Sequence, residues 1–437
     1  MVSVYYTLYD RILDVQGLRR AFLRVKAAKG GPGIDGQTIA EFELDLHHNL
    51  TTLLTELREK SYRPLPVKES LIPKLDSKEP RKLGIPAVRD RVVQHALLSI
   101  IQPIFEPEFH PSSYAYRPER SQHQAIAKAA LFIRRYEMQH VVDIDIAKCF
   151  DTLDHSLILQ AFRTKIADGS ILNLLKMFLE SGVMKYEGWR ATTEGSPQGG
   201  VISPLIANLY LNSFDQFAKE RGHRIVRFAD DIRIFTRSRS AAENSLKQAK
   251  QYLEKNLRLR LNTEKTCIVH ADDGVDFLGV RIYPLYTGIQ DKRLARFKQK
   301  VKAKTKRNSS SNLKQVIDDV NPLLRGFITY YRIANCSWSI NRIMRWIRRR
   351  LRAKQLKLWK TNKRLCRRIR QLGRDAPTTG FRMSSWASSL SQLVHIAISN
   401  SYLHKELGLY DMAAVPTGIP VLLPERIRVD MSRVRGP

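Results

Sequence analysis

The sequence predicts an α+β protein with an antiparallel sheet, and three observations carry this prediction. Residues 141–145 form a short apolar segment that alternates with Asp, which indicates a strand ending on a carboxylate. Residues 225–235 hold two apolar arms around an Ala-Asp-Asp turn, which is the pattern of a β-hairpin. Residues 90–105 place apolar side chains on one face of a helix. Strands and helices therefore both contribute to the fold.

The remaining elements follow from turn residues and apolar periodicity. The Gly- and Pro-rich loop at 29–36 separates an N-terminal helix from a second helix at 38–60. Prolines at positions 66, 73 and 80 indicate extended strands and turns across 70–82. Two more helices are predicted at 204–219 and 241–256, and a strand at 275–282.

A long helical segment is predicted near the C-terminus. Residues 338–372 contain no Gly or Pro. Apolar residues recur there every seven positions, at Met344, Leu351, Leu358, Leu365 and Leu372. This spacing is typical of a core stripe on one or two packed helices. A leucine-zipper dimer is the alternative, and the sequence does not set the oligomeric state.

The length, the cysteine spacing and the hydropathy of the chain exclude several classes of protein. With 437 residues, of which 43% are hydrophobic, the chain can form about three domains with substantial cores. Cys149, Cys267, Cys336 and Cys366 are too far apart for a zinc finger, so we interpret them as intracellular thiols. No apolar run is long enough to span a membrane, and the N-terminus lacks the apolar core of a signal peptide. We therefore expect a cytoplasmic protein.

Positive charge is concentrated in the C-terminal third of the chain. There are 74 Lys and Arg against 42 Asp and Glu, a formal net charge of +32. Residues 281–375 alone hold 28 basic and 4 acidic residues, whereas residues 1–280 carry a net charge of only +6. Such a segment is typical of a polyanion-binding surface, because each neutralised phosphate releases counterions. Nucleic acid is the first candidate partner, and an anionic membrane surface is the second.

Three carboxylates are candidates for a metal site. Asp145 ends the predicted strand, and Asp230 and Asp231 lie between the arms of the predicted hairpin. Paired acids inside an apolar hairpin are costly unless a cation neutralises them. Mg²⁺ fits, because it takes oxygen ligands and shares sites with substrate phosphates. Two ions about 4 Å apart align an attacking hydroxyl with a leaving pyrophosphate. Alone, however, an Asp-Asp pair also fits an ordinary hairpin turn.

An ordered series of motifs resembles the reverse transcriptases, most closely the group II intron branch. The C-terminal members of the series are Asp145-Ile-Ala-Lys-Cys-Phe-Asp151, Glu194-Gly-Ser-Pro-Gln-Gly-Gly200, Phe228-Ala-Asp-Asp231, Asn262-Thr-Glu-Lys-Thr266, Phe277-Leu-Gly279 and Leu324-Arg-Gly-Phe-Ile-Thr-Tyr-Tyr331. The N-terminal members are Gly30-Gly-Pro-Gly-Ile-Asp-Gly36, Tyr62-Arg-Pro64, Ile72-Pro-Lys74, Arg81-Lys-Leu-Gly-Ile-Pro86, Asp90-Arg-Val-Val-Gln94 and Ser113-Tyr-Ala-Tyr-Arg-Pro118. The resemblance covers roughly residues 8–410 and is specific because all motifs occur in the family's order.

The resemblance implies an RNA-directed DNA polymerase with a right-hand fold. It implies an N-terminal extension at 1–36, fingers and palm at 37–285, a three-helix thumb or maturase domain at 286–375, and a short DNA-binding-like segment with a tail at 376–437. The implied cofactor is a pair of Mg²⁺ ions, with Mn²⁺ as a substitute. The implied partners are an RNA template, a DNA or RNA primer, deoxynucleoside triphosphates and group II intron RNA.

The resemblance also implies roles for individual residues. Asp145, Asp230 and Asp231 would be the catalytic carboxylates, with the Ile146 carbonyl as a further metal ligand and Lys265 as a proton donor to pyrophosphate. The nucleotide-binding residues would be Lys74, Arg81, Phe150, Gln198 and Gly199, with Phe150 excluding a 2′-hydroxyl. The primer grip would be Phe277, Leu278 and Gly279. Charge and helical spacing, rather than the resemblance, give the candidate nucleic-acid-binding arginines, which are Arg345, Arg349 and Arg352, on one helical face at intervals of three and four, and Arg367.

Alternatives remain for some of these residues. Phe150 also fits a core position, and Lys265 also fits an exposed lysine beside a strand. Asp143 and Asp151 fit structural or solvent-facing roles better than metal ligation.

The sequence departs from the family pattern in two motifs. Phe228 stands where Tyr is usual, which removes a phenol oxygen but keeps the ring, so we expect polymerisation to survive. Lys82 stands where Pro is usual, which removes a fixed φ beside Arg81. The paired cysteines of the family's C-terminal nuclease domain do not occur, so DNA cutting is not expected.

Two other functions fit the same motifs. One is an RNA-binding splicing cofactor that polymerises only incidentally. The other is a domesticated host reverse transcriptase that acts in DNA repair or phage defence.

Overall fold

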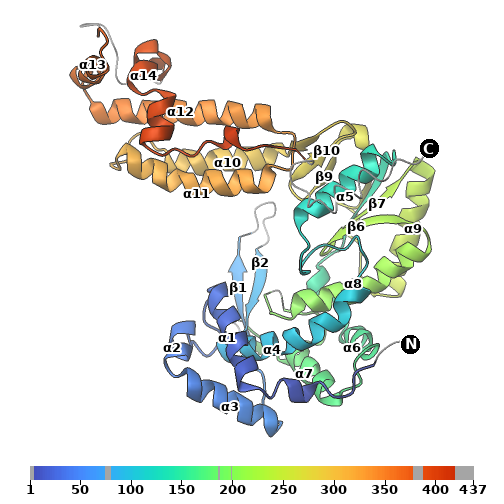
Figure 1. The fold of residues 1–437 in the computed structure, drawn as a ribbon. Helices are drawn as coiled ribbons and strands as arrows, with labels where there is room; N and C mark the ends of the chain where they lie inside the picture. Colours follow the sequence, from blue (N-terminus) through green and yellow to red (C-terminus); the bar gives the residue numbers. More distant parts are fainter. Residues whose placement is uncertain (1–3, 74–79, 186–187, 198, 377–386, 419–437) are drawn as a thin grey trace. The chain divides into compact units, whose positions relative to one another are not determined.

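The computed structural model describes residues 4–73, 80–185, 188–197, 199–376 and 387–418 (Figure 1). The chain divides into two compact units, one combining residues 1–128 with 137–269 and the other combining 129–136 with 270–437. This division falls before residue 285, the expected end of the palm, because the short strands that follow residue 270 group with the C-terminal helices.

A four-stranded sheet in the first unit contains the predicted strand and hairpin. Its strands, in spatial order, are β6 (Arg224–Phe228), β7 (Asp231–Thr236), β3 (His140–Asp145) and β8 (Cys267–His270). Both β3 and β6 pair with β7 in antiparallel orientation. The cross-strand pairs Val142–Ile234 and Ile144–Ile232 lie in the core. Because side chains alternate between faces, Asp145 and Asp231 lie together on the opposite face.

Two long helices cover the apolar face of this sheet. They are α8 (Ser203–Glu220), which contacts β6, and α9 (Arg239–Lys255), which contacts β3 and β7 (Figure 1). Ser238 caps α9 by accepting a hydrogen bond from the Ala241 backbone N–H. Both helices were predicted from the sequence, and the apolar side chains that predicted them face the core.

The N-terminal segment forms helices on either side of the glycine-rich loop. They are α1 (Val15–Ala28), α2 (Ile39–Leu44), α3 (Leu46–Arg58) and, after the loop and two strands, α4 (Val88–Phe105). The prediction of a single helix at 38–60 is wrong. Two helices form instead, because the backbone of Asp45 leaves the helical region at φ −122° and ψ 48°. Gly33 has no room for a side chain, since a Cβ there would lie 2.5 Å from the Ala87 Cα.

A second four-stranded sheet and three more helices complete the first unit. The strands, in spatial order, are β2 (Arg81–Ile85), β1 (Val67–Ile72), β4 (Val183–Lys185) and β5 (Gly188–Arg190). Strands β1 and β2 are antiparallel and confirm extended structure at residues 70–72 and 81–82 of the predicted segment. Residues 74–79 of that segment lie outside the described part of the chain. The helices are α5 (Gln122–Arg134), α6 (His155–Arg163) and α7 (Gly169–Glu180). Residues 129–134 of α5 belong to the second unit.

The second unit opens with a small sheet made of β9 (Val275–Phe277), β10 (Val280–Ile282) and β11 (Thr287–Ile289). The single strand predicted at 275–282 is wrong. Leu278 and Gly279 have φ values of 47° and 82°, so they form a two-residue turn between β9 and β10.

Helices form the rest of the second unit. They are α10 (Asp291–Lys304), α11 (Leu313–Tyr331), α12 (Ser337–Trp359), α13 (Asn362–Gln371) and α14 (Gln392–Ala397) (Figure 1). Met344, Leu351 and Leu365 of the seven-residue repeat are buried, whereas Leu372 is exposed. The repeat is therefore a core stripe on two helices, which end and begin around Lys360 and Thr361. No helix in the described part of the chain is both long and apolar enough to cross a bilayer.

All four cysteines are free thiols. Cys149, Cys336 and Cys366 are buried and Cys267 is exposed. This agrees with the thiol interpretation of their spacing.

One buried carboxylate links two of the N-terminal motifs. Asp90 accepts a 2.6 Å hydrogen bond from the Tyr62 hydroxyl and a 3.0 Å hydrogen bond from the Leu65 backbone N–H. Burial nevertheless raises the pKa of Asp90 to about 6, because these bonds and Arg89 offset desolvation only in part.

Asp90 is expected to make stability rise as the pH falls. Its pKa is higher in the folded than in the unfolded chain, so the folded state binds the proton first and gains stability as the pH falls from 7 to 4. Between pH 7 and pH 4, the free energy of unfolding in urea should rise by about 2 kcal/mol more for the wild type than for Asp90→Asn. The exposed-site variant Asp10→Asn is the control. An identical pH dependence for the wild type and Asp90→Asn would contradict the assignment.

Candidate active site

The turn between β6 and β7 carries the central pair of acids. Phe228 pairs with Asp231, so Ala229 and Asp230 form a two-residue turn. Ala229 has φ 59°, a left-handed conformation that costs a residue with a Cβ about 1 kcal/mol or more. Strain of this kind persists only where surrounding contacts impose it, and such places cluster at functional sites.

A buried arginine imposes this conformation. The Arg227 side chain is fully buried and binds the equally buried Asp215 through both Nε and Nη2, at 2.9 and 2.6 Å. Its Nη1 donates to the Ala229 carbonyl at 3.1 Å and to Asn208 Oδ1 at 3.0 Å. Arg227 therefore ties the turn to α8, from which Asp215 and Asn208 both project.

The structure brings together two of the three predicted carboxylates. Asp145 and Asp231 are the last cross-strand pair between β3 and β7, and such pairs hold their Cβ atoms about 5 Å apart. Burial raises the pKa of Asp231, Arg233 lowers it, and the charge of Asp145 raises it again. The third acid, Asp230, lies in the turn, where its charge adds to burial in raising the pKa of the Cys149 thiol.

Two cations take up part of this negative charge. Arg233 is buried and bonds both Asp231 Oδ1 and, at 2.7 Å, Asp143 Oδ1. This ion pair fits the structural role expected for Asp143. Lys265 Nζ lies 3.5 Å from Asp145 Oδ2 and both side chains are accessible to solvent. Lys265 thus reaches the acidic pair from the turn that follows Asn262, whose backbone N–H donates to the Asp145 carbonyl at 2.8 Å.

The acidic side chains at the adjoining ends of β3 and β7 can bind a divalent cation. The available ligands are carboxylate oxygens, the atoms that Mg²⁺ and Mn²⁺ prefer. Asp145 raises the pKa of Asp231, so a cation between the two would relieve a real repulsion. Among the described residues, no group of three or more acidic, His or Cys side chains is already gathered as a metal site. Ile146, whose carbonyl is the further predicted ligand, follows directly after β3.

The loop at 194–200 lies against the segment that follows β3. The Ser196 N–H donates to the Phe150 carbonyl and the Gly195 N–H to the Leu153 carbonyl, at 2.8 and 2.7 Å. A Cβ on Gly195 would lie 2.7 Å from the Asp151 carbonyl oxygen, so only glycine allows this approach. Phe150 is half-buried at the rim of the core. Its position fits both predictions made for it, a packing residue and a surface beneath a sugar.

Glycine also brings this loop close to strand β2. A Cβ on Gly199 would lie 2.5 Å from the Gly84 carbonyl oxygen, and Gly199 has φ 112°. Lys82 of the same strand and Lys148 lower the pKa of Asp151, although burial raises it more. The backbone of Arg81 pairs with Ile72. The other nucleotide-binding candidates, Lys74 and Gln198, lie outside the described residues.

The predicted primer grip is a tight turn within the second unit. Phe277 is buried, and the Leu278 carbonyl accepts a 2.8 Å hydrogen bond from the Tyr330 hydroxyl of α11. A Cβ on Gly279 would lie 3.1 Å from the Tyr331 hydroxyl oxygen. The Phe277-Leu-Gly279 and Leu324–Tyr331 motifs are therefore in contact.

The basic residues of the C-terminal helices fall into two groups. Arg345 on α12 and Arg367 on α13 are exposed, and Arg349 is half-buried. Arg352 corrects our prediction, because it is only 3% exposed and donates to the Ile398 carbonyl and Asn400 Oδ1 at 2.9 and 2.8 Å. Its guanidinium holds the C-terminal segment in place, so we withdraw it from the set that contacts phosphate.

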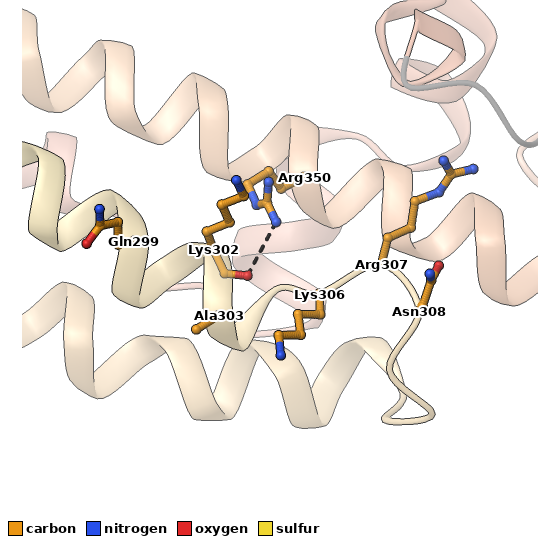
Figure 2. A pocket seen from close by; sticks show the side chains of 7 residues that line it. All are labelled: Gln299, Lys302, Ala303, Lys306, Arg307, Asn308 and Arg350. Atoms are coloured by element: carbon orange, nitrogen blue, oxygen red, sulfur yellow. Dashed lines mark hydrogen bonds between the residues drawn. The ribbon is translucent and has the colours of Figure 1, made fainter.

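A basic hollow of about 500 Å³ lies between the end of α10 and α12 (Figure 2). Lys302, Lys306 and Arg307 line it, with Arg350 on its wall. Arg350 donates to Thr305 Oγ1 at 2.7 Å and to the Thr305 carbonyl at 3.0 Å, which closes the end of α10. No carboxylate is among the residues that line the hollow.

Comparison with known proteins bears on both units. The family profile of reverse transcriptase (RNA-dependent DNA polymerase) matches residues 72–282, and that of the group II intron maturase-specific domain matches residues 294–373. Protein YkfC of Escherichia coli is 36% identical over 288 residues, which cover 57% of this chain and 75% of YkfC. This chain belongs to the group II intron reverse transcriptase/maturase family.

One further relative and one solved structure are less similar to this reverse transcriptase. The group II intron-encoded protein LtrA of Lactococcus lactis is 27% identical over 348 residues, 64% of this chain and 57% of LtrA. The chain therefore spans a little more than half of LtrA. Telomerase from Candida albicans has a solved structure that aligns with a TM-score of 0.41 and 13% identity, over 82% of this chain and 67% of the telomerase chain.

Sequence reasoning missed Arg227 as a site residue of this reverse transcriptase. The signal was present, because a charged side chain interrupts the apolar arm Ile225-Val226 just before the turn. Its partner Asp215 is on a different element and gave no local signal. A buried charge needs a partner, but the sequence does not reveal which acid provides it.

Arg227 is expected to be a positioning residue. Arg227→Met should lower the free energy of unfolding by about 3–5 kcal/mol, because Asp215 stays buried without a partner. Adding Asp215→Leu should recover most of that loss in urea unfolding. Primer extension by the double variant should nevertheless remain reduced by about 10²-fold, because the Ala229 carbonyl has lost its donor. Recovery of both stability and extension would show that the pair is only structural.

Proposed function

We propose that this protein extends a primer on an RNA template by two-metal nucleotidyl transfer and that its basic C-terminal unit binds group II intron RNA. The observation that supports the polymerase part is the Asp145–Asp231 cross-strand pair at the ends of the two central strands, next to a strained turn. The reverse transcriptase profile covers both acids, and family members depend on divalent metal ions.

The carboxylates would serve the reaction by holding divalent ions. Asp145 and Asp231, with Asp230 in the turn, would bind Mg²⁺, or Mn²⁺ as a substitute, and the Ile146 carbonyl is a candidate further ligand. When bound, such ions lower the pKa of a primer hydroxyl and neutralise the leaving pyrophosphate. The protein's own part is to fix these acids through Arg227 and Arg233. Lys265, 3.5 Å from Asp145, would move toward the pyrophosphate and deliver a proton.

The nucleotide would lie between the segment after β3 and strand β2. Phe150 would form the floor beneath its sugar. Gly199, which packs on Gly84, leaves the backbone of the 194–200 loop close to β2 without a side chain between them. Lys74, Arg81 and Gln198 are the proposed triphosphate and base contacts, and Phe277–Gly279 would hold the primer end.

A maturase role is the second candidate and uses the same chain. The group II intron maturase-specific profile covers the basic helices α10 to α13. Arg345, Arg349 and Arg367 are the proposed phosphate contacts there.

Asp145→Asn should reduce primer extension with Mg²⁺ by about 10²-fold or more, as removal of a catalytic group usually does. Its side chain is accessible, so folding and binding to a template–primer duplex should be retained. Asp10→Asn is the control, because it removes an exposed carboxylate charge outside the site and should leave the activity unchanged within about twofold. A result in which Asp145→Asn extends primers as well as Asp10→Asn does would refute the assignment.

Phe150→Ala should relax sugar selection. Removing the ring opens space beneath the sugar, so ribonucleotides should compete about tenfold better with deoxynucleotides in single-nucleotide extension. Thermal unfolding gives the control for folding. If the ratio of ribonucleotide to deoxynucleotide incorporation does not change in a folded variant, Phe150 is a packing residue only.

A further inference from the structure

A second hollow, of about 640 Å³, lies along α12 and differs from the basic hollow in having aromatic walls. Helix α12 contributes Trp338, Arg342, Arg345, Trp346 and Arg349, and the segment after η5 (Ala387–Leu390) contributes Asn400. The residues that line it include no Asp or Glu. We call this surface the Trp338 groove.

Trp338 is unusually accessible for its size. It lies in the first turn of α12 and is 68% exposed. Burying a tryptophan removes about 150–250 Å² from water, and the ring of Trp338, exposed beside a hollow lined with arginines, offers this surface to a ligand. The guanidinium carbon of Arg342, one turn later, lies 5.4 Å from the ring centroid. The Arg342 cation keeps the Trp338 ring oriented, while the exposed surface of the ring remains available for stacking.

The arginines of the groove have different tasks. Arg348 Nη1 lies 3.3 Å from Nε2 of His404. The other ring nitrogen of His404, Nδ1, lies 2.8 Å from the Leu409 carbonyl oxygen. Together with Arg352, Arg348 thus fastens α12 to the C-terminal segment. Arg345 is exposed, and the Nε atom of Arg349 is buried with no hydrogen-bond partner among the described residues. Arg345 and Arg349 are one turn apart on the helix, so both can face one ligand.

We propose that the Trp338 groove binds single-stranded nucleic acid, with one unpaired base stacked on Trp338 and the neighbouring phosphates on Arg345 and Arg349. A flat ring beside cations is the arrangement that recognises unpaired bases without regard to sequence. A duplex would gain little from Trp338, because its bases are already stacked on each other. The proposal rests on the proposed function only in taking nucleic acid as the partner, and it does not require polymerisation.

The test measures binding in the Asp145→Asn background, so that loss of catalysis has no bearing on it. Labelled 12-mer RNA, DNA of the same sequence, and a 12-base-pair duplex are titrated by fluorescence anisotropy. Trp338→Ala should weaken single-strand binding about tenfold, since stacking contributes about 1–3 kcal/mol per base. Duplex binding should change less than twofold. Trp338→Phe should retain most of the single-strand affinity.

The control and the outcomes separate the alternatives. Trp189→Ala removes another exposed tryptophan, 55% accessible, from strand β5 and should leave single-strand affinity unchanged within twofold. A larger effect on RNA than on DNA, or the reverse, identifies which strand occupies the groove, and either supports the proposal. Equal weakening of duplex and single strand, or no change in either, overturns it. With the wild-type Asp145 in place, the Trp338→Ala variant should extend a short template–primer normally, and loss of extension would assign Trp338 to template–primer binding instead.

Discussion

The ion pair between Arg227 and Asp215 determines where the acidic turn lies. Both side chains are fully buried, and an unpaired charge at that depth would cost several kcal/mol. The guanidinium therefore has no low-energy alternative to its present position. From there its remaining N–H groups reach Asn208 and the Ala229 carbonyl, so the strained turn is held by the same interaction that satisfies the charge. The turn leads directly into β7, which begins at Asp231, the residue that pairs with Asp145 of β3.

The C-terminal unit also contains buried cations, but these bind neutral oxygens. Arg350 and Arg352 are buried, and Lys354 Nζ donates to the Ser309 carbonyl at 2.9 Å. Each of the three side chains donates hydrogen bonds to neutral oxygens. Desolvation accordingly lowers the pKa of each. Their charge is structural, yet it adds to the positive field that Arg345, Arg367 and the lysines of α10 present to a polyanion.

The elements that sequence predicted well are those whose signal is local. The hairpin, β3, α8 and α9 follow from alternation and helical periodicity, and the order of the motifs identified the acids. The sequence failed where a single residue changes the path of the chain. Asp45 splits a helix, and Leu278 with Gly279 splits a strand, because backbone conformation there overrides the apolar pattern. Arg352 was assigned to the surface because its helical spacing matches Arg345 and Arg349, and only its contact with Ile398, distant in sequence, shows that it is buried.

The central claim is that Arg227 and Asp215 keep Asp145 and Asp231 in position to share a divalent cation. Binding of Mn²⁺, followed by electron paramagnetic resonance of the free ion, tests this without any substrate. The wild type should bind Mn²⁺, Asp145→Asn should lose most of that binding, and the folded Arg227→Met/Asp215→Leu variant should bind about 10–100-fold more weakly, as expected when the support of a metal ligand is removed. Equal Mn²⁺ affinity in the wild type and the folded double variant would contradict the account.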